Sequence, residues 1–259
     1  MAKTLKKSAH KVNDTGICKN CGNQVSGNFC SYCGQSTSTH KLNIHFILHD
    51  LQHALFHFEK GILFTAKELL TRPGNTIREF IEGKRVKHIQ PLSFVILLAT
   101  FYGLLYHYFI FSQFKTPLIG PTDDITGASG KIITWITDHF AFDCLILIIT
   151  ITLVSYVIFK KKQYNLAEHL VLNTFLIGLF LVVSLSLFPF AFFFGNAVTL
   201  QYSLIQQAIL LVLMCWCYAQ FFNYTSKVKI IGLAFISFLI ISVINLAIGY
   251  FASWIVMQF

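Results

Sequence analysis

Charged side chains are scarce in this sequence. Of its 259 residues only 12% are Asp, Glu, Lys or Arg, whereas 55% are hydrophobic and 27 are Phe. Soluble domains carry about one charged residue in four, because their surfaces face water. The composition therefore excludes an ordinary soluble domain and indicates an integral membrane protein.

Motifs that would identify an activity are also missing. The sequence has neither a glycine-rich phosphate loop nor a Gly-x-Ser-x-Gly elbow, so nucleotide hydrolysis and serine esterase chemistry have no support. Residues 1–17 contain four lysines but no apolar run of the length that a signal peptide needs. We interpret this segment as a basic, disordered tail that is not exported.

Cysteines near the N-terminus form the strongest local motif. Residues 18–35 contain two Cys-x-x-Cys-Gly knuckles, and eight residues separate the two cysteine pairs. Such pairs can bind one tetrahedral ion, and four sulfur ligands leave no open position for substrate. We therefore expect a zinc ribbon with one structural Zn²⁺ per chain; the alternative, a pair of disulfides, does not suit a cytoplasmic segment. The expected ligands are Cys18, Cys21, Cys30 and Cys33.

Residues 42–89 predict amphipathic helices beside the membrane. In the first of them, apolar residues gather on one face at helical spacing, and the opposite face has a histidine at every fourth position. Histidines one turn apart can share a metal ion, sense pH or relay protons. The other interpretation is an interfacial helix whose polar side is rich in histidine. This row consists of His45, His49, His53 and His57.

Basic residues concentrate before the first long apolar run. Residues 1–89 contain thirteen Lys and Arg against six acids, a net charge of +7. Anionic lipid head groups account for this charge more simply than nucleic acid, at about 1 kcal/mol per basic residue near the surface. Basic residues in this position also place the N-terminus in the cytoplasm. The expected head-group contacts are Arg72, Arg78, Lys84, Arg85 and Lys87.

Five apolar segments in residues 90–259 are long enough to cross a membrane, which takes about twenty residues each. They lie near 90–112, 141–159, 168–194, 201–222 and 230–256. Connections rich in lysine alternate with connections poor in it, as five spans with a cytoplasmic N-terminus and an external C-terminus require. The sequence thus predicts an all-α integral membrane protein with about five transmembrane helices. A merged or re-entrant hairpin across 168–222 is the alternative for the third and fourth spans.

The middle of every predicted span lacks Asp, Glu, Lys, Arg and His, which transporters normally use to hold coupling ions. Glu168 and His169 stand at the inner edge of the third span, with Asn173 one turn further along. A carboxylate and an imidazole at this depth could act on a lipid head group by acid–base or metal chemistry. Alternatively, they cap the helix and bond to the basic segment before the first span.

Three segments together resemble a known family. These are the Cys-x-x-Cys-Gly ribbon, RPGNTIREFIEGKR running into QPLSF, and YNLAEHLVLNTF at 164–175. In combination they are similar to the bacterial family labelled domain of unknown function 3667, over roughly residues 18–180. The resemblance implies a zinc ribbon fused to a multi-span membrane domain, and it brings no activity, cofactor or catalytic residue with it.

Two functions remain open for a bacterial inner-membrane protein of this kind. A closed metal site, spans without ionisable residues and the lack of a nucleophile motif favour a non-enzymatic adaptor or scaffold. It would bind a protein partner or a second copy of the chain. The alternative is a lipid-facing membrane enzyme or lipid transporter that uses the His45–His57 row with Glu168 and His169.

Overall fold

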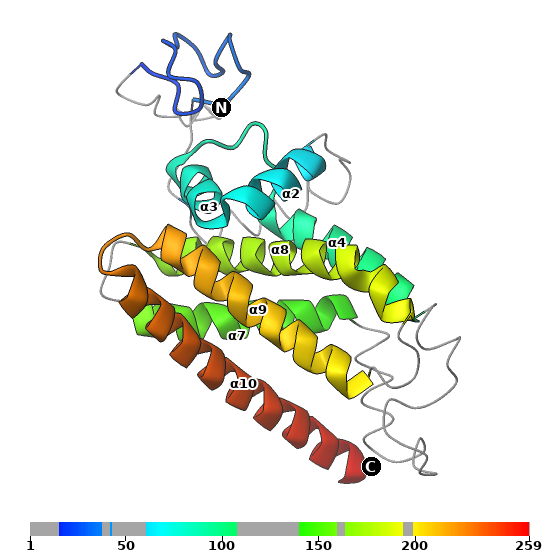
Figure 1. Cartoon of the computed structure of the whole chain (residues 1–259). Coiled ribbons are helices and arrows are strands. Elements are labelled where there is room, and N and C mark those ends of the chain that lie inside the picture. Colours follow the sequence, from blue (N-terminus) through cyan, green and yellow to red (C-terminus); the bar gives the residue numbers. More distant parts are fainter. Residues whose placement is uncertain are drawn as a thin grey trace, which may run out of the picture.

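The computed structural model describes residues 16–37, 42, 61–107, 140–159, 164–193 and 199–258. These residues form three parts, which Figure 1 shows one above another. A ribbon of residues 16–37 has two isolated β-bridges, Ile17 with Gln24 and Phe29 with Ser36. A cap of residues 61–90 follows, and a bundle of apolar helices lies beneath it.

The bundle consists of five helices, four of them long and apolar enough to cross a membrane and one shorter. They are α4 (Pro91–Tyr106), α7 (Phe140–Phe159), α8 (Leu166–Phe193), α9 (Thr199–Phe221) and α10 (Lys227–Gln258). The chain is therefore an all-α, multi-pass membrane protein, as the sequence predicts. The long helices begin and end within three residues of predicted spans. The shorter helix is α4, and residues 108–112 of the first predicted span lie outside the described residues.

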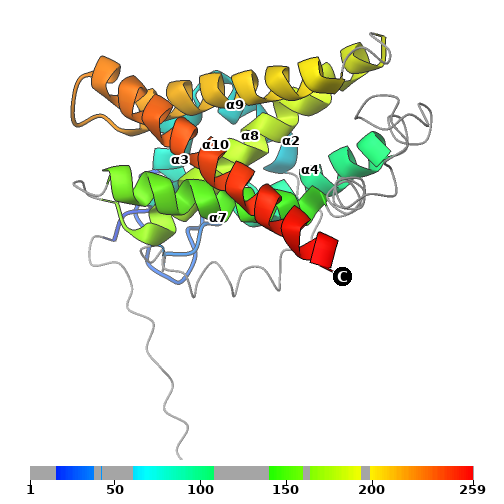
Figure 2. The same ribbon diagram turned by 90° about the horizontal axis from the view of Figure 1, so that it is seen from below.

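Helix α8 is the centre of the bundle. It contacts α4, α7 and α9, and 61% of its apolar stretch is buried, against 22% for α10. Gly178 allows α4 to approach closely, because a Cβ there would lie 2.6 Å from Cδ1 of Phe94. Helices α8 and α9 are separate and pack side by side, so residues 168–222 do not merge into one span. Helix α10 runs obliquely across α7 on the face away from the cap (Figures 1 and 2).

The cap contains α2 (Gly61–Thr71), α3 (Pro73–Glu82) and residues 83–90. Proline begins α3, and Gly83 ends it with a left-handed φ of 117° that favours glycine. Ile77 and Phe80 are buried, and the Phe80 ring meets Phe175 of α8 edge-on at 5.1 Å. The apolar side of α3, expected on lipid, thus packs on protein. Helix α8 has 28 residues, about 42 Å of helix against about 30 Å of hydrocarbon, which leaves its first turns available to the cap.

The cap is fixed to the end of α9. A methyl group at Gly74 would overlap the backbone of α9 at Cys217 and Phe221, so only glycine fits without a shift. Arg78 donates hydrogen bonds from its guanidinium to the carbonyls of Gln220 and Phe221, which carry the partial negative charge of a helix C-terminus. The cap therefore lies on the side of the bundle where α9 ends and α10 begins (Figure 1).

Candidate metal centre

The two knuckles of the ribbon have the same backbone geometry. In each, the glycine amide donates to the carbonyl of the first cysteine, Gly22 to Cys18 at 2.9 Å and Gly34 to Cys30 at 2.8 Å. The glycine φ angles are 77° and 74°, a region that other residues rarely adopt. The sequence motif thus folds locally into paired turns that direct four sulfur atoms towards one point.

The four sulfur atoms are arranged to hold a single metal ion. Sγ of Cys18 lies 3.6 Å from that of Cys33, and Sγ of Cys21 lies 3.5 Å from that of Cys30. All four ligand atoms lie within 4.8 Å of one another. A tetrahedral ion about 2.3 Å from each sulfur would separate the sulfurs by about 3.8 Å. These distances fit a four-thiolate centre and far exceed the disulfide bond length of about 2.05 Å.

The pKa values of two of the thiols are shifted in opposite directions. The amide of Gln35 donates to the Cys33 sulfur and lowers the pKa of that thiol to about 6. The amide of Asn23 acts in the same direction on Cys21, but burial and the three neighbouring thiols raise its pKa to about 11. Without an ion the four groups cannot all ionise together, because like charges this close repel. A cation removes that repulsion, so metal binding and loss of the remaining protons are coupled.

Gln35 fastens the ribbon to the cap. Its side-chain Nε2 donates to the carbonyl of Gly83 at 2.7 Å, and its Oε1 accepts from the amide of Arg85 at 3.2 Å. The side chain is only 4% exposed. The sequence gives no signal for this role of Gln35. Asn23 is a similar amide at the same place in the first knuckle, and nothing in the sequence tells the two residues apart.

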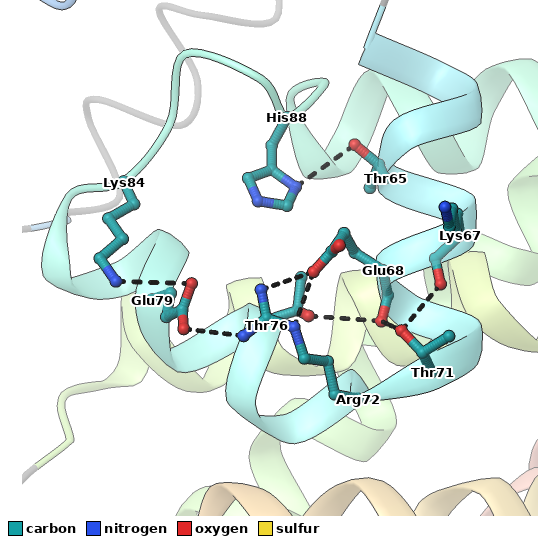
Figure 3. A network of polar contacts seen from close by, with 9 residues as sticks. All are labelled: Thr65, Lys67, Glu68, Thr71, Arg72, Thr76, Glu79, Lys84 and His88. Atoms are coloured by element: carbon teal, nitrogen blue, oxygen red, sulfur yellow. Dashed lines mark hydrogen bonds and ion pairs between the residues drawn. The ribbon is translucent and has the colours of Figure 1, made fainter. Parts of the chain in front are cut away.

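Three of the residues predicted to contact lipid form polar contacts with protein groups, in the cap or at the end of α9. Arg72 pairs with Glu68 at 2.6 Å and with Glu79 at 2.9 Å, and Lys84 lies 3.6 Å from Glu79 (Figure 3). Although burial raises it, the pKa of Glu79 is lowered overall by its hydrogen bond to Arg72 and the nearby cations. Arg78 is directed to the end of α9 instead. These cations thus link α2, α3 and the bundle.

The other two predicted contacts cover aromatic rings. The guanidinium of Arg85 lies 5.5 Å from the centre of the Phe80 ring, and the ammonium of Lys87 lies 5.8 Å from that of Phe64. Such cation–π contacts are compatible with exposure of the charged ends on the outer side. Contact with lipid head groups stays a prediction for all five residues.

His88 is enclosed by the cap, where its Nδ1 lies 3.5 Å from the hydroxyl of Thr65 (Figure 3). The rings of Phe64 and Phe80 pack against it, with centres 5.1 and 6.1 Å away. Burial lowers the pKa of His88 below its ordinary value of 6.5. The Thr65 hydroxyl also accepts from the amide of Ile89 at 3.1 Å, so Thr65 joins α2 to the connection before α4.

Glu168 and His169 contact different partners. Glu168 forms a capping box with Asn165, in which the amide of Asn165 donates to Glu168 Oε2 at 2.8 Å and the amide of Glu168 donates to Asn165 Oδ1 at 2.9 Å. His169 is 1% exposed and its Nδ1 lies 3.1 Å from the hydroxyl of Ser155 on α7. Glu168 therefore caps the start of α8, and His169 belongs to the interior.

A buried polar network joins three helices beside His169. Asn173 of α8 donates to the hydroxyl of Ser155 at 2.9 Å and accepts from the hydroxyl of Tyr218 of α9 at 2.7 Å. All three side chains are fully buried. The sequence places Asn173 one turn from His169 but gives no signal for Ser155 and Tyr218, which come from other helices. Within the described part of the chain, Nε2 of His169 has no hydrogen-bond partner.

The predicted histidine row lies outside the described residues, as does the tail up to residue 15. His45, His49, His53 and His57 therefore stay a prediction, both as a metal site and as the polar side of an interfacial helix.

Comparison with known proteins assigns a family resemblance without an activity. Residues 59–103 match the model of a family described as protein of unknown function (DUF3667). The chain resembles this family. The matched residues include the cap and most of α4, while the ribbon lies outside the match. No curated protein and no solved structure matches the chain.

Proposed function

We propose that this protein is a non-enzymatic membrane adaptor whose ribbon, closed by one structural Zn²⁺, is held on the bundle and presents aromatic side chains to a protein partner. One observation carries the proposal. Tyr32 is 79% exposed and Phe29 is 68% exposed, although Gln35, close by in the same knuckle, is buried against the cap. The ribbon is thus fixed on one side and offers aromatic anchors elsewhere.

The chemistry of the ribbon suits binding better than catalysis. Four thiolates complete the coordination of a tetrahedral ion, which leaves no position for water or substrate. Aromatic side chains are enriched at protein interfaces because they bury large areas with few rotatable bonds. A module this small needs its metal to fold, and the rigid fold then holds Tyr32 and Phe29 at the surface.

The proposed location is the bacterial inner membrane, with the N-terminus in the cytoplasm and the C-terminus outside. Because the cap binds where α9 ends, it lies on the side of Lys227 and Lys229. Helix α7 ends on that side too, because the ring of its last residue, Phe159, stacks on Phe222 just after α9. In the sequence Lys160–Lys162 follow α7 directly. Lysine-rich connections favour the cytoplasm and anionic head groups, to which Lys84 and Lys87 would add their charges.

Photo-crosslinking in living cells tests the adaptor function. A photoreactive residue at position 32 should give one discrete protein adduct, and Phe29→Ala should abolish that adduct without changing the metal content. The matched control is a photoreactive residue at Lys67, which is exposed on α2 and should give no such adduct. Crosslinks to lipid alone, or the same adduct from both positions, would contradict a partner held by the ribbon.

The alternative of a lipid-facing enzyme or transporter needs Glu168 and His169 as a reactive pair. In the structure Glu168 takes part in a capping box, and His169 contacts the buried Ser155 hydroxyl. Its remaining basis is the His45–His57 row. A second metal that persists after loss of the ribbon would favour it.

A further inference from the structure

Each knuckle glycine is followed by a residue with a side-chain amide: Asn23 in the first knuckle and Gln35 in the second. Their backbones act alike, since the carbonyl of Asn23 accepts from Cys18 and that of Gln35 accepts from Cys30, both at 2.8 Å. Their amides each donate to a sulfur, on Cys21 and Cys33. Their side chains differ completely, because Asn23 is exposed and Gln35 is buried against the cap.

The amide group of Gln35 holds the connection between α3 and α4 by both of its ends. It binds the carbonyl of Gly83 and the amide of Arg85, so residues 83–85 cannot leave without breaking two hydrogen bonds. Arg85 in turn donates to the carbonyl of Phe80 and covers its ring. Phe80 packs against Phe175 of α8, so the contact continues from the ribbon into the bundle.

The backbone hydrogen bonds of Gln35 both go to the second knuckle. Its amide and its carbonyl bind Cys33 and Cys30, which belong to the candidate metal site. A short ribbon without its ion lacks the buried core that would keep these cysteines in place. The direction of the Gln35 side chain therefore depends on the ion.

We propose that the second knuckle is a metal-dependent latch: metal binding orients Gln35, which then holds residues 83–85 and so fixes the path from the cap into membrane helix α4. The latch rests on the metal-bound ribbon of the proposed function but needs no protein partner. Loss of the ion releases residues 83–85 while α8 and α9 stay packed. Metal binding in the ribbon is thus coupled to the position of the segment that leads into the first membrane helix.

Hydrogen–deuterium exchange of the full chain in detergent tests the latch, because the amide of Arg85 donates one of the two hydrogen bonds to the Gln35 side chain. With Zn²⁺ bound, Gln35→Ala should speed exchange in residues 83–87 about ten-fold, the effect of losing hydrogen bonds worth about 1.4 kcal/mol. Metal content should stay that of the wild type. Asn23→Ala is the matched control and should exchange like the wild type.

Metal removal is the second half of the experiment. A chelator should speed exchange of residues 83–87 in the wild type to the rate of Gln35→Ala, and added Zn²⁺ should restore protection only in the wild type. Unchanged exchange in Gln35→Ala, equal acceleration in Asn23→Ala, or wild-type protection that is indifferent to Zn²⁺ would each overturn the latch. Because no partner is in the sample, these results do not depend on whether the protein acts as an adaptor.

Discussion

At Gly74 the cap packs directly on the backbone of α9. A methyl group there would overlap the α9 backbone at Cys217 and Phe221, and backbone cannot move aside as a flexible side chain can. We predict that Gly74→Ala lowers the free energy of unfolding by about 1–3 kcal/mol, the usual cost of overpacking. Thermal unfolding in detergent measures the loss. Gly232→Ala on α10, where a Cβ meets open space, should show none.

Asn173 is the centre of the buried polar network. Asn173→Leu would remove the acceptor of the Tyr218 hydroxyl in the interior, while the Ser155 hydroxyl keeps its contacts with Thr152 and His169. An unsatisfied buried group costs about 1–3 kcal/mol, so we expect a clear fall in the unfolding temperature. The control is Ser186→Ala, since Ser186 is exposed and bonds only within α8, to Val182. Equal stability of the two variants would argue against the network.

His88 predicts a pH dependence of the cap. Burial lowers its pKa in the folded protein below 6.5, so below about pH 6.5 the unfolded chain binds the proton more readily. The wild type should therefore lose stability as the pH falls from 6.5 towards 5, and His88→Gln should lose less over that range. Unfolding temperatures across this range for both proteins measure the difference. Parallel curves would mean that His88 does not titrate as its burial requires.

Helix α3 is the element that holds the cap on the bundle. Arg78 is its polar contact with the C-terminus of α9, and Ile77 and Phe80 supply the apolar part. We predict that Arg78→Ala speeds amide exchange throughout α3 at least about ten-fold, because bonds to a charged donor are worth about 1.5–3 kcal/mol. Lys67→Ala, which removes an exposed cation from α2, should leave exchange in α3 as it is. Similar effects of both changes would indicate a general role of charge instead.

The elements were predictable to different degrees. Long apolar segments define α7 to α10, because crossing a membrane demands a fixed length of apolar residues. The surroundings of α3 were not predictable, because an apolar side looks the same whether lipid or protein covers it. The sequence predicts an amphipathic helix beside the membrane, and the structure places Ile77 and Phe80 in the core. The bonds of Arg78 to the carbonyls at the end of α9 were likewise not predictable, because those carbonyls lie far along the sequence.

At the scale of the whole molecule, the grouping of the four cysteines was the most predictable part of the ribbon, and the attachment of the ribbon to the cap was the least. Ligation by Cys18, Cys21, Cys30 and Cys33 depends on spacing within one short segment, which the sequence displays directly. The attachment through Gln35 depends on Gly83 and Arg85, about fifty residues further along. Contacts between such distant segments leave no periodic pattern in a single sequence.

We propose that one structural Zn²⁺ closes the ribbon of a membrane adaptor. Metal content per chain of the purified protein in detergent tests it most directly, for the wild type and for Cys18→Ser with Cys21→Ser. We predict one zinc per wild-type chain and none in the double variant. A wild-type chain without metal would contradict the structural centre. A metal that survives the double change would reveal a second site and make a metalloenzyme the better description.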